Sequence, residues 1–271
     1  MNPLTSSYRI TVAAVLATGF LGTSQLPATA SIQLTSVNRP SPSPQQILLA
    51  GRLGFKLNVR PSVYRVGGFT RGSCSSTDIT VVSPPTQPEE HAPRQDVESV
   101  AVDSTISSHP TLFVNIPAEV SATKAELLVQ NEAGDREIYD TTFQLTGKPG
   151  IVGIRIPNTA PPLEVGQKYQ WQFSVFCDPN DSTDRLSTSS WIERISIDPT
   201  LASRIERATP REQLSIYAEA GIWQDMLSTL AELLYSNPND QSLAQDWASL
   251  MQTVNLNNFA NQPIVQIAGK Q

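Results

Sequence analysis

Apolar side chains occupy every second position of residues 168–177, and the polar residues Lys168, Gln170, Gln172 and Ser174 lie between them. The apolar positions are Tyr169, Trp171, Phe173, Val175 and Cys177. Because successive side chains of a β-strand point to opposite faces, a period of two indicates a strand with one buried face. The pattern therefore predicts a half-buried strand in which Cys177 faces the core beside aromatic rings.

Similar apolar stretches occur on both sides of this strand. The candidate strands are residues 79–82, 112–116, 125–129, 138–145, 151–156, 168–177 and 191–197. Stretches rich in turn-forming residues, at 132–135, 147–150 and 157–162, separate several of them. Short strands at this spacing predict a mainly β fold, an antiparallel β-sandwich over residues 55–198 in which each strand buries one face.

The period changes after Asp198, where residues 199–259 predict a short C-terminal helical segment of about three helices. Thr209 can cap a helix whose first turn contains Pro210 and Glu212. A second helix follows Gly221, and the Asn-Pro-Asn-Asp stretch at 237–240 ends it before a third. We expect residues 260–271 to be a disordered tail.

Residues 217–238 contain Tyr-x3-Gly-x-Trp and an apolar run that ends at Asn-Pro. This stretch resembles one tetratricopeptide-type repeat, with Met226 at a position where that family has alanine. A single repeat cannot bury its own apolar face, since solenoids need several repeats. We therefore expect the helical segment to pack onto the sandwich.

The N-terminal 30 residues resemble a secretory signal. Arg9 precedes an uncharged stretch, and Ala28-Thr29-Ala30 provides a small-residue cleavage site, so the mature chain would begin near Ser31. The apolar stretch is too short to span a bilayer, and we expect no membrane span after cleavage. The predicted location is the periplasm, the thylakoid lumen or the extracellular space.

Two later stretches have the composition of poorly packed chain. Residues 31–54 include Arg-Pro-Ser-Pro-Ser-Pro and are predicted to be a disordered Pro/Ser linker. Residues 83–108 contain several prolines and few large apolar groups, and they predict a long loop that leaves the sandwich.

The formal net charge is −6, and removal of the signal would take away Arg9 and no acid. Lysine and arginine are scattered along the sequence instead of clustered. An acidic chain without a basic patch lacks the electrostatic footprint of a nucleic-acid or anionic-membrane binder. These classes of partner are therefore excluded.

The chain has two cysteines, Cys74 and Cys177. An even count in an exported chain, with Cys177 facing the core, predicts a structural disulfide between them. Two separately buried thiols are the alternative. A redox centre is not expected, because neither cysteine has a close cysteine neighbour.

The residues offer little catalytic chemistry. His91 lies in the proline-rich loop and His109 precedes Pro110 at a strand entrance, where hydrogen bonding to the backbone is the common role. Nucleophile-elbow, zinc-protease and phosphate-loop motifs are absent from the sequence. A carboxylate pair, as in glycoside hydrolases, is the remaining enzymatic route. We therefore expect that the protein is not an enzyme and binds no cofactor.

One stretch has the oxygen ligands of a half calcium loop at alternating positions: Asp178, Asn180, Ser182 and Asp184. The match with an EF-hand fails twice, since Thr183 replaces the required glycine and Ser189 replaces the bidentate glutamate. An ordinary Asp-Pro turn is the favoured interpretation of this stretch.

Residues 163–171, Leu-Glu-Val-Gly-Gln-Lys-Tyr-Gln-Trp, resemble the turn and strand of immunoglobulin- and fibronectin III-like domains. Further motifs are Arg-Gly-Ser-Cys at 71–74, His-Pro-Thr at 109–111, Phe-Cys-Asp-Pro at 176–179, Trp-Ile-Glu-Arg at 191–194 and Gly-Ile-Trp at 221–223. Together they resemble the cyanobacterial family called domain of unknown function 928, although Ser190 stands where that family has glycine. The resemblance implies an exported cyanobacterial protein and matches both cysteine-bearing motifs, and it implies no activity.

Two classes of function follow. The first is a non-catalytic extracytoplasmic protein-interaction or structural module, with an envelope-associated protein as partner. The alternative is a β-sandwich that binds a glycan or another small ligand. The alternative depends on exposed aromatic residues, and Trp191 and Trp223, with Tyr64 or Phe69 nearby, are its candidates for a ligand surface.

Overall fold

A computed structural model describes residues 60–62, 77–85, 100–178 and 180–269. The predicted signal peptide, the linker at 31–54, Cys74 and residues 86–99 of the predicted loop lie outside the described residues.

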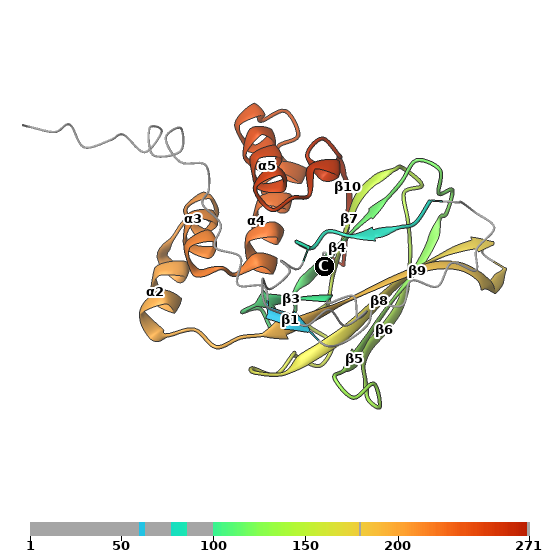
Figure 1. The fold of residues 1–271 in the computed structure, drawn as a ribbon, viewed down its shortest axis with the longest axis horizontal. Coiled ribbons are helices and arrows are strands. Elements are labelled where there is room, and N and C mark those ends of the chain that lie inside the picture. Colours follow the sequence, from blue (N-terminus) through green and yellow to red (C-terminus); the bar gives the residue numbers. More distant parts are fainter. Residues whose placement is uncertain (1–59, 63–76, 86–99, 179, 270–271) are drawn as a thin grey trace, which may run out of the picture. The chain divides into compact units, whose positions relative to one another are not determined.

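The described strands form two sheets (Figure 1). Sheet A has the order β1 (Arg60–Ser62), β3 (Val100–Thr105), β9 (Asp181–Arg194), β8 (Lys168–Asp178), β5 (Lys124–Asn131) and β6 (Glu137–Gln144). Sheet B has the order β10 (Ile264–Ala268), β7 (Gly150–Arg155), β4 (Thr111–Ile116) and β2 (Thr80–Val81). The protein is therefore mainly β, as predicted.

Both sheets are mixed, so the prediction of a purely antiparallel sandwich is wrong. β3 runs parallel to β9, with Val102 opposite Trp191, and β10 runs parallel to β7, with Ile267 opposite Gly153. Parallel neighbours need a long connection, and each of these pairs joins strands that are far apart in the sequence. Neither partner strand was expected, because β3 lies in the predicted loop 83–108 and β10 in the predicted tail 260–271.

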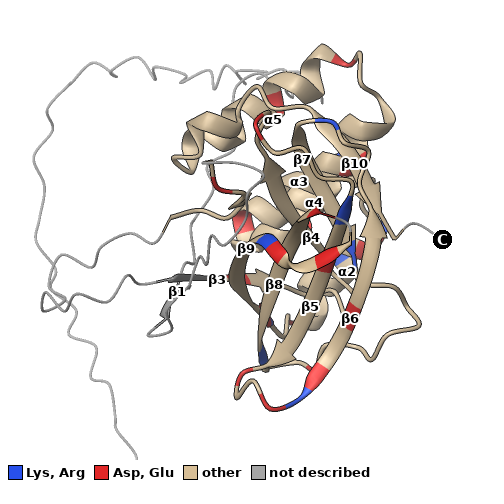
Figure 2. Cartoon of the chain, turned by 90° about the vertical axis from the view of Figure 1, so that its right-hand side faces the viewer, with Lys and Arg blue, Asp and Glu red and all other residues tan. Residues whose placement is uncertain are grey.

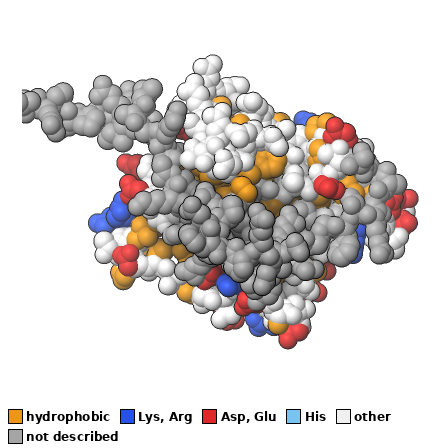
Figure 3. All heavy atoms as spheres, in the orientation of Figure 1, with side chains coloured by type: hydrophobic (Ala, Val, Ile, Leu, Met, Phe, Trp, Pro, Cys, Tyr) orange, Lys and Arg blue, Asp and Glu red, His pale blue; other side chains and the backbone are white. Residues whose placement is uncertain are grey.

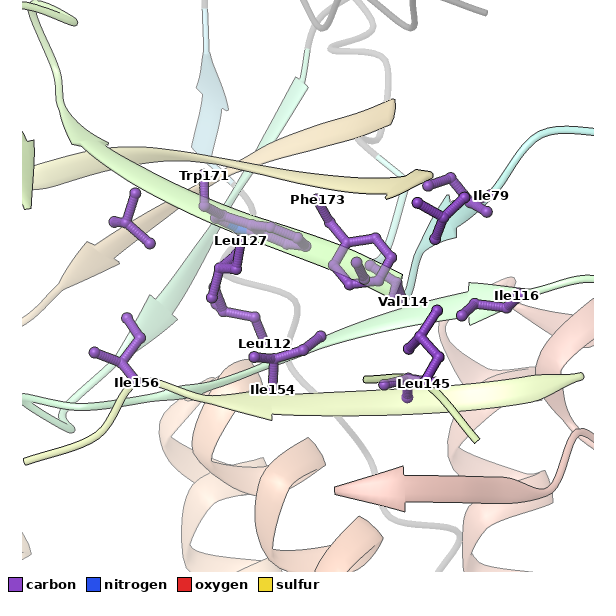
Figure 4. Packing of buried hydrophobic residues seen from close by; sticks show 14 of the residues in the cluster. Ile79, Leu112, Val114, Ile116, Leu127, Leu145, Ile154, Ile156, Trp171 and Phe173 are labelled. Atoms are coloured by element: carbon purple, nitrogen blue, oxygen red, sulfur yellow. The ribbon is translucent and has the colours of Figure 1, made fainter. Parts of the chain in front are cut away.

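The two sheets enclose one apolar core. Leu127, Trp171 and Phe173 of sheet A point toward Leu112 and Ile154 of sheet B, and all five are at most 2% exposed (Figure 4). The alternation in residues 168–177 thus places its aromatic side chains in the core, as predicted. Figure 4 also shows helices on the far side of sheet B.

Strands β4 and β7 are buried on both faces, which corrects the prediction of one buried face for each strand. Leu112 and Val152 join the core between the sheets, whereas Phe113 and Ile151 join a second core with the helices. Sheet B is therefore a middle layer, and its continuous apolar runs reflect burial on both sides.

Four α-helices follow, where about three were predicted. They are α2 (Pro199–Arg207), α3 (Pro210–Ala220), α4 (Trp223–Ser236) and α5 (Gln241–Thr253), with a 3₁₀ turn η1 (Asn257–Phe259). The additional helix is the short, largely polar α2, whose N-cap Asp198 accepts bonds from the backbone N of Thr200 and Leu201, each at 2.9 Å.

The predicted helix boundaries further along are confirmed. Thr209 and Glu212 form a reciprocal capping box at the start of α3, and Gly221 ends this helix in the left-handed region with φ 72°. Asn237 is the C-cap of α4. The helices pack onto sheet B, as expected, through the core that includes Phe113.

Candidate functional site

A polar cleft of about 490 Å³ opens where the helices meet the sheets. Its walls include the chain from the end of β3 to the start of β4, namely Thr105 and residues 107–111. Arg155 at the end of β7 and parts of α3 and α4 complete them. We call it the polar cleft. His109 lies in it, but Trp191, Trp223 and the four calcium candidates do not.

One side of α4 supplies much of the cleft wall. Its lining residues are Asp225, Ser228, Thr229, Glu232, Leu233 and Ser236. The other side of the helix, which includes Met226, Leu227 and Leu230, is buried. The polar stripe at helical spacing is visible in the sequence, but such a stripe is usually solvated, so it does not predict a cleft by itself.

Asp225 fixes α4 against the end of β3. Its Oδ2 accepts a hydrogen bond from the backbone N of Ile106 at 3.0 Å, and Ser104 Oγ donates to the Gly221 carbonyl at 3.1 Å. Burial raises the pKa of Asp225 to about 6, although hydrogen bonds to its carboxylate act in the opposite direction. Burial and the charge of Asp225 raise the pKa of Tyr217 to about 12.

Asp103 of β3 is a second buried carboxyl, outside the cleft lining. It is 5% exposed and accepts a hydrogen bond from Ser83 Oγ at 2.7 Å. Burial raises its pKa to about 7, and the bond from Ser83 lowers it. Buried acids with raised pKa values often mark functional sites, and these two acids lie on either side of the contact between β3 and α4.

His109 links the segment between β3 and β4 to the loop that follows β7. Its Nε2 lies 3.0 Å from the Ala160 carbonyl, which can only accept, so we assign the proton to Nε2. In the neutral ring Nδ1 then accepts from Ser108 Oγ at 2.9 Å. The bond to Ala160 is the backbone role that the sequence favours for this histidine.

An ion pair connects sheet B to α4 at the cleft. Arg155 Nη2 donates to Glu232 Oε1, and Arg155 Nε donates to Thr111 Oγ1 at 3.3 Å. Each ionic side chain is about one-third exposed, 35% for Arg155 and 31% for Glu232, so both remain accessible from the cleft. The pair places a fixed cation and a fixed anion at the same site.

The prediction of a ligand surface at Trp191 and Trp223 is wrong. Trp191 in β9 and Trp223 at the start of α4 are each only 3% exposed. Trp191 pairs with Gln170 and Val102 in the middle of sheet A, and Trp223 belongs to the core between the helices and sheet B. Their burial removes the feature on which the glycan alternative depended; Tyr64 and Phe69 lie outside the described residues.

The calcium candidate falls on a β-hairpin. Asp178 ends β8 opposite Asp181, and Ser182 and Asp184 lie within β9. Asp178 Oδ1 accepts from the backbone N of Asn180 at 2.8 Å. Alternate residues of a strand lie along its length instead of converging on a point, so this geometry does not assemble the calcium half loop, which the sequence itself disfavours. Over the described ranges, no group of three or more His, Cys, Asp and Glu could hold a metal ion.

Cys177 is partly buried against the core between the sheets, consistent with its predicted orientation. Because Cys74 lies outside the described residues, the disulfide stays a prediction.

Over the part of the chain that the structure describes, the surface carries charges of both signs without a basic stripe. Figure 2 shows acidic and basic residues interspersed along the strands of sheet A. On the face in Figure 3, hydrophobic side chains form small patches among polar ones. Among the described residues, the exposed large hydrophobic side chains are Val165 at 51% and Tyr235 at 42%.

The fold and the site define the class of protein. It has two mixed β-sheets, C-terminal helices packed on one of these sheets, and a polar cleft at the junction. The family described as Domain of Unknown Function (DUF928) matches residues 66–264, and the chain belongs to this family. No curated protein matches the chain. In the described part, none of the helices has the length and apolar character needed to cross a membrane.

Proposed function

We propose that the protein is an exported, non-catalytic module that binds another extracytoplasmic protein by strand addition at β6. The observation that carries the proposal is the position of β6 at the edge of sheet A, where its described strand partner is β5 alone. An edge strand presents unpaired backbone groups, and an extended segment of a partner can pair with them.

The ladder between β5 and β6 indicates which groups face outward. The backbone N of Leu145 donates to Thr123 at 2.8 Å, so this is a hydrogen-bonded pair. Since such pairs alternate along an antiparallel ladder, Phe143 and Thr141 bond to β5, whereas Thr142 and Asp140 direct their backbone groups away from it. Residues 140–142 therefore form the centre of the open edge.

Side chains limit which segment can pair there. Gln266 Nε2 donates to the Gln144 carbonyl at 2.8 Å, which closes the end of the edge beyond Thr142. Glu137 and Asp140 are exposed along the edge. A second copy of β6 would add two more carboxylates at this edge, so the charges favour a different chain with lysine or arginine in its extended segment.

Export, the Cys74–Cys177 disulfide, a cyanobacterial source and the immunoglobulin- or fibronectin III-like ancestry of the sheets are parts of the same proposal. The sequence of the first 30 residues supports export. The location remains one of periplasm, thylakoid lumen or extracellular space.

The test is affinity capture of the tagged mature chain from its host, compared with two variants of one residue. Thr142→Pro removes the outward N–H and leaves the bonds of Thr141 and Phe143 to β5, whereas Thr142→Ala keeps the N–H. We expect a stoichiometric envelope protein with the wild type and Thr142→Ala and its loss with Thr142→Pro. Unchanged recovery with a folded Thr142→Pro variant would refute strand addition.

A further inference from the structure

We propose that the polar cleft is a separate binding site for a neutral, hydroxyl-rich ligand, a short saccharide, which contacts the Arg155–Glu232 pair. The inference is independent of the β6 edge, because it rests on other residues, where sheet B meets the helices, whereas β6 lies at the edge of sheet A. It moves the ligand-binding alternative away from the buried tryptophans.

Charge argues against an anionic ligand. Arg155 is the cation of the pair with Glu232, and Asp225 adds a second carboxyl to the lining. At pH 7 the cleft therefore carries at least as much negative as positive charge. A phosphate or carboxylate would compete with Glu232 for the guanidinium and would meet Asp225 as well, so binding would leave like charges close together.

Hydrogen-bond chemistry distinguishes a polyol from a cation. The cleft combines the carboxylate of Glu232, which only accepts, with the guanidinium of Arg155, which only donates. Asn158, exposed at the rim, offers both a donor and an acceptor. A sugar hydroxyl also donates and accepts, so neighbouring hydroxyls can satisfy both partners, whereas an ammonium group would leave the guanidinium facing a like charge.

The site is preorganised. The hydrogen bond from His109 to the Ala160 carbonyl fixes the segment between β3 and β4, and that from Ile106 to Asp225 fixes α4. Thr111 orients Arg155. A volume of about 490 Å³ lies within the range of small-molecule sites. Binding would therefore cost little ordering of the protein, which favours affinity for a small ligand.

The test applies the mature chain to an array of neutral oligosaccharides, uronic-acid oligosaccharides and amino-sugar oligosaccharides, followed by calorimetric titration of the best neutral probe. We expect retention on neutral probes. Glu232→Gln should weaken binding by about tenfold or more, since a bond to a charged acceptor is lost. The matched control is Glu219→Gln, an exposed acid on α3 that pairs with Arg204 at 3.1 Å outside the cleft, and it should bind as the wild type does.

Asn158→Leu is the second variant, because it leaves the ion pair intact and changes only an exposed rim residue. It should also weaken the neutral probe, while Thr142→Pro should not. Absence of binding to every neutral probe, a preference for the charged probes, or equal affinity of wild type, Glu232→Gln and Asn158→Leu would each overturn the proposal. If Thr142→Pro abolishes partner capture and leaves saccharide binding unchanged, the two sites are independent, and the loss concerns the β6 edge alone.

Discussion

Gly153 in β7 is a position where the packing requires the absence of a side chain. A Cβ built there lies 2.7 Å from Cε1 of Phe113 and 3.2 Å from Cγ2 of Thr111. The neighbouring β4 side chain can therefore cross the backbone of β7 and reach the helices, where Phe113 is 1% exposed. One glycine thus helps to make sheet B a middle layer.

We predict that Gly153→Ala lowers the free energy of unfolding by about 1–3 kcal/mol, because Phe113 must leave its position. Urea denaturation measures the change. The same substitution in a Phe113→Leu background should cost at least 0.5 kcal/mol less, since the smaller side chain can give way. Strict additivity of the two substitutions would show that the contact with Phe113 is not the cause.

At the scale of elements, β10 converts a predicted tail into part of sheet B. Its Ile267 is buried, and the backbone N of Ile151 donates to the Pro263 carbonyl at 2.8 Å. Gln266 also accepts from the backbone N of Thr146 at 3.0 Å, which connects β10 to the chain after β6. The strand therefore links sheet B to the edge of sheet A.

Ile267→Ala should lower the free energy of unfolding by about 2 kcal/mol, since a buried side chain would leave a cavity. Gln266→Ala, which removes hydrogen bonds at a partly exposed site, should cost only about 1 kcal/mol. Chemical denaturation of both variants checks the difference. If Ile267→Ala unfolds at the wild-type urea concentration, residues 264–268 do not contribute to the folded structure.

For the whole molecule, the raised pKa values of two buried acids predict how stability depends on pH. Asp103 has a folded-state pKa of about 7 against 3.8 for the ordinary side chain. Between these values the folded state binds more protons than the unfolded state, so stability falls as the pH rises from about 4 to 7. Asp225 acts in the same direction up to about pH 6. Hydrogen bonds lower the pKa of Asp198 and Glu212. The stability that these two carboxylates contribute is therefore lost only as the pH falls below their ordinary pKa values.

We expect Asp103→Asn to flatten this slope and to raise the free energy of unfolding at pH 8 by up to about 4 kcal/mol, while the amide oxygen still accepts from Ser83. Thermal and urea unfolding from pH 4 to 8 give the slope. Asp140→Asn, at an exposed residue of β6, serves as the surface control and should keep the wild-type slope. A slope that is equal in Asp103→Asn and in the wild type would assign the pH dependence to other groups.

Much of the candidate site could not be predicted from the sequence. The hydrogen bond of His109 to the backbone was anticipated, because this is the common role of a histidine at a strand entrance. The contact of Arg155 with Glu232, and that of Asp225 with Ile106, join elements that are far apart along the chain. Nothing near either residue in the sequence indicates its partner.

The features that could be derived from the amino-acid order alone are local ones. They are the alternation at 168–177, the capping box at Thr209, the helix boundary at Gly221 and the helix end at Asn237. Each depends on residues within a few positions of each other, so period and capping chemistry suffice. Tertiary structure decided the parallel strands β3 and β10, the double burial of β4 and β7, the burial of Trp191 and Trp223, and the cleft. Each of these depends on which distant surface covers a residue, and a strand or stripe has the same local pattern whether that surface is solvent or protein.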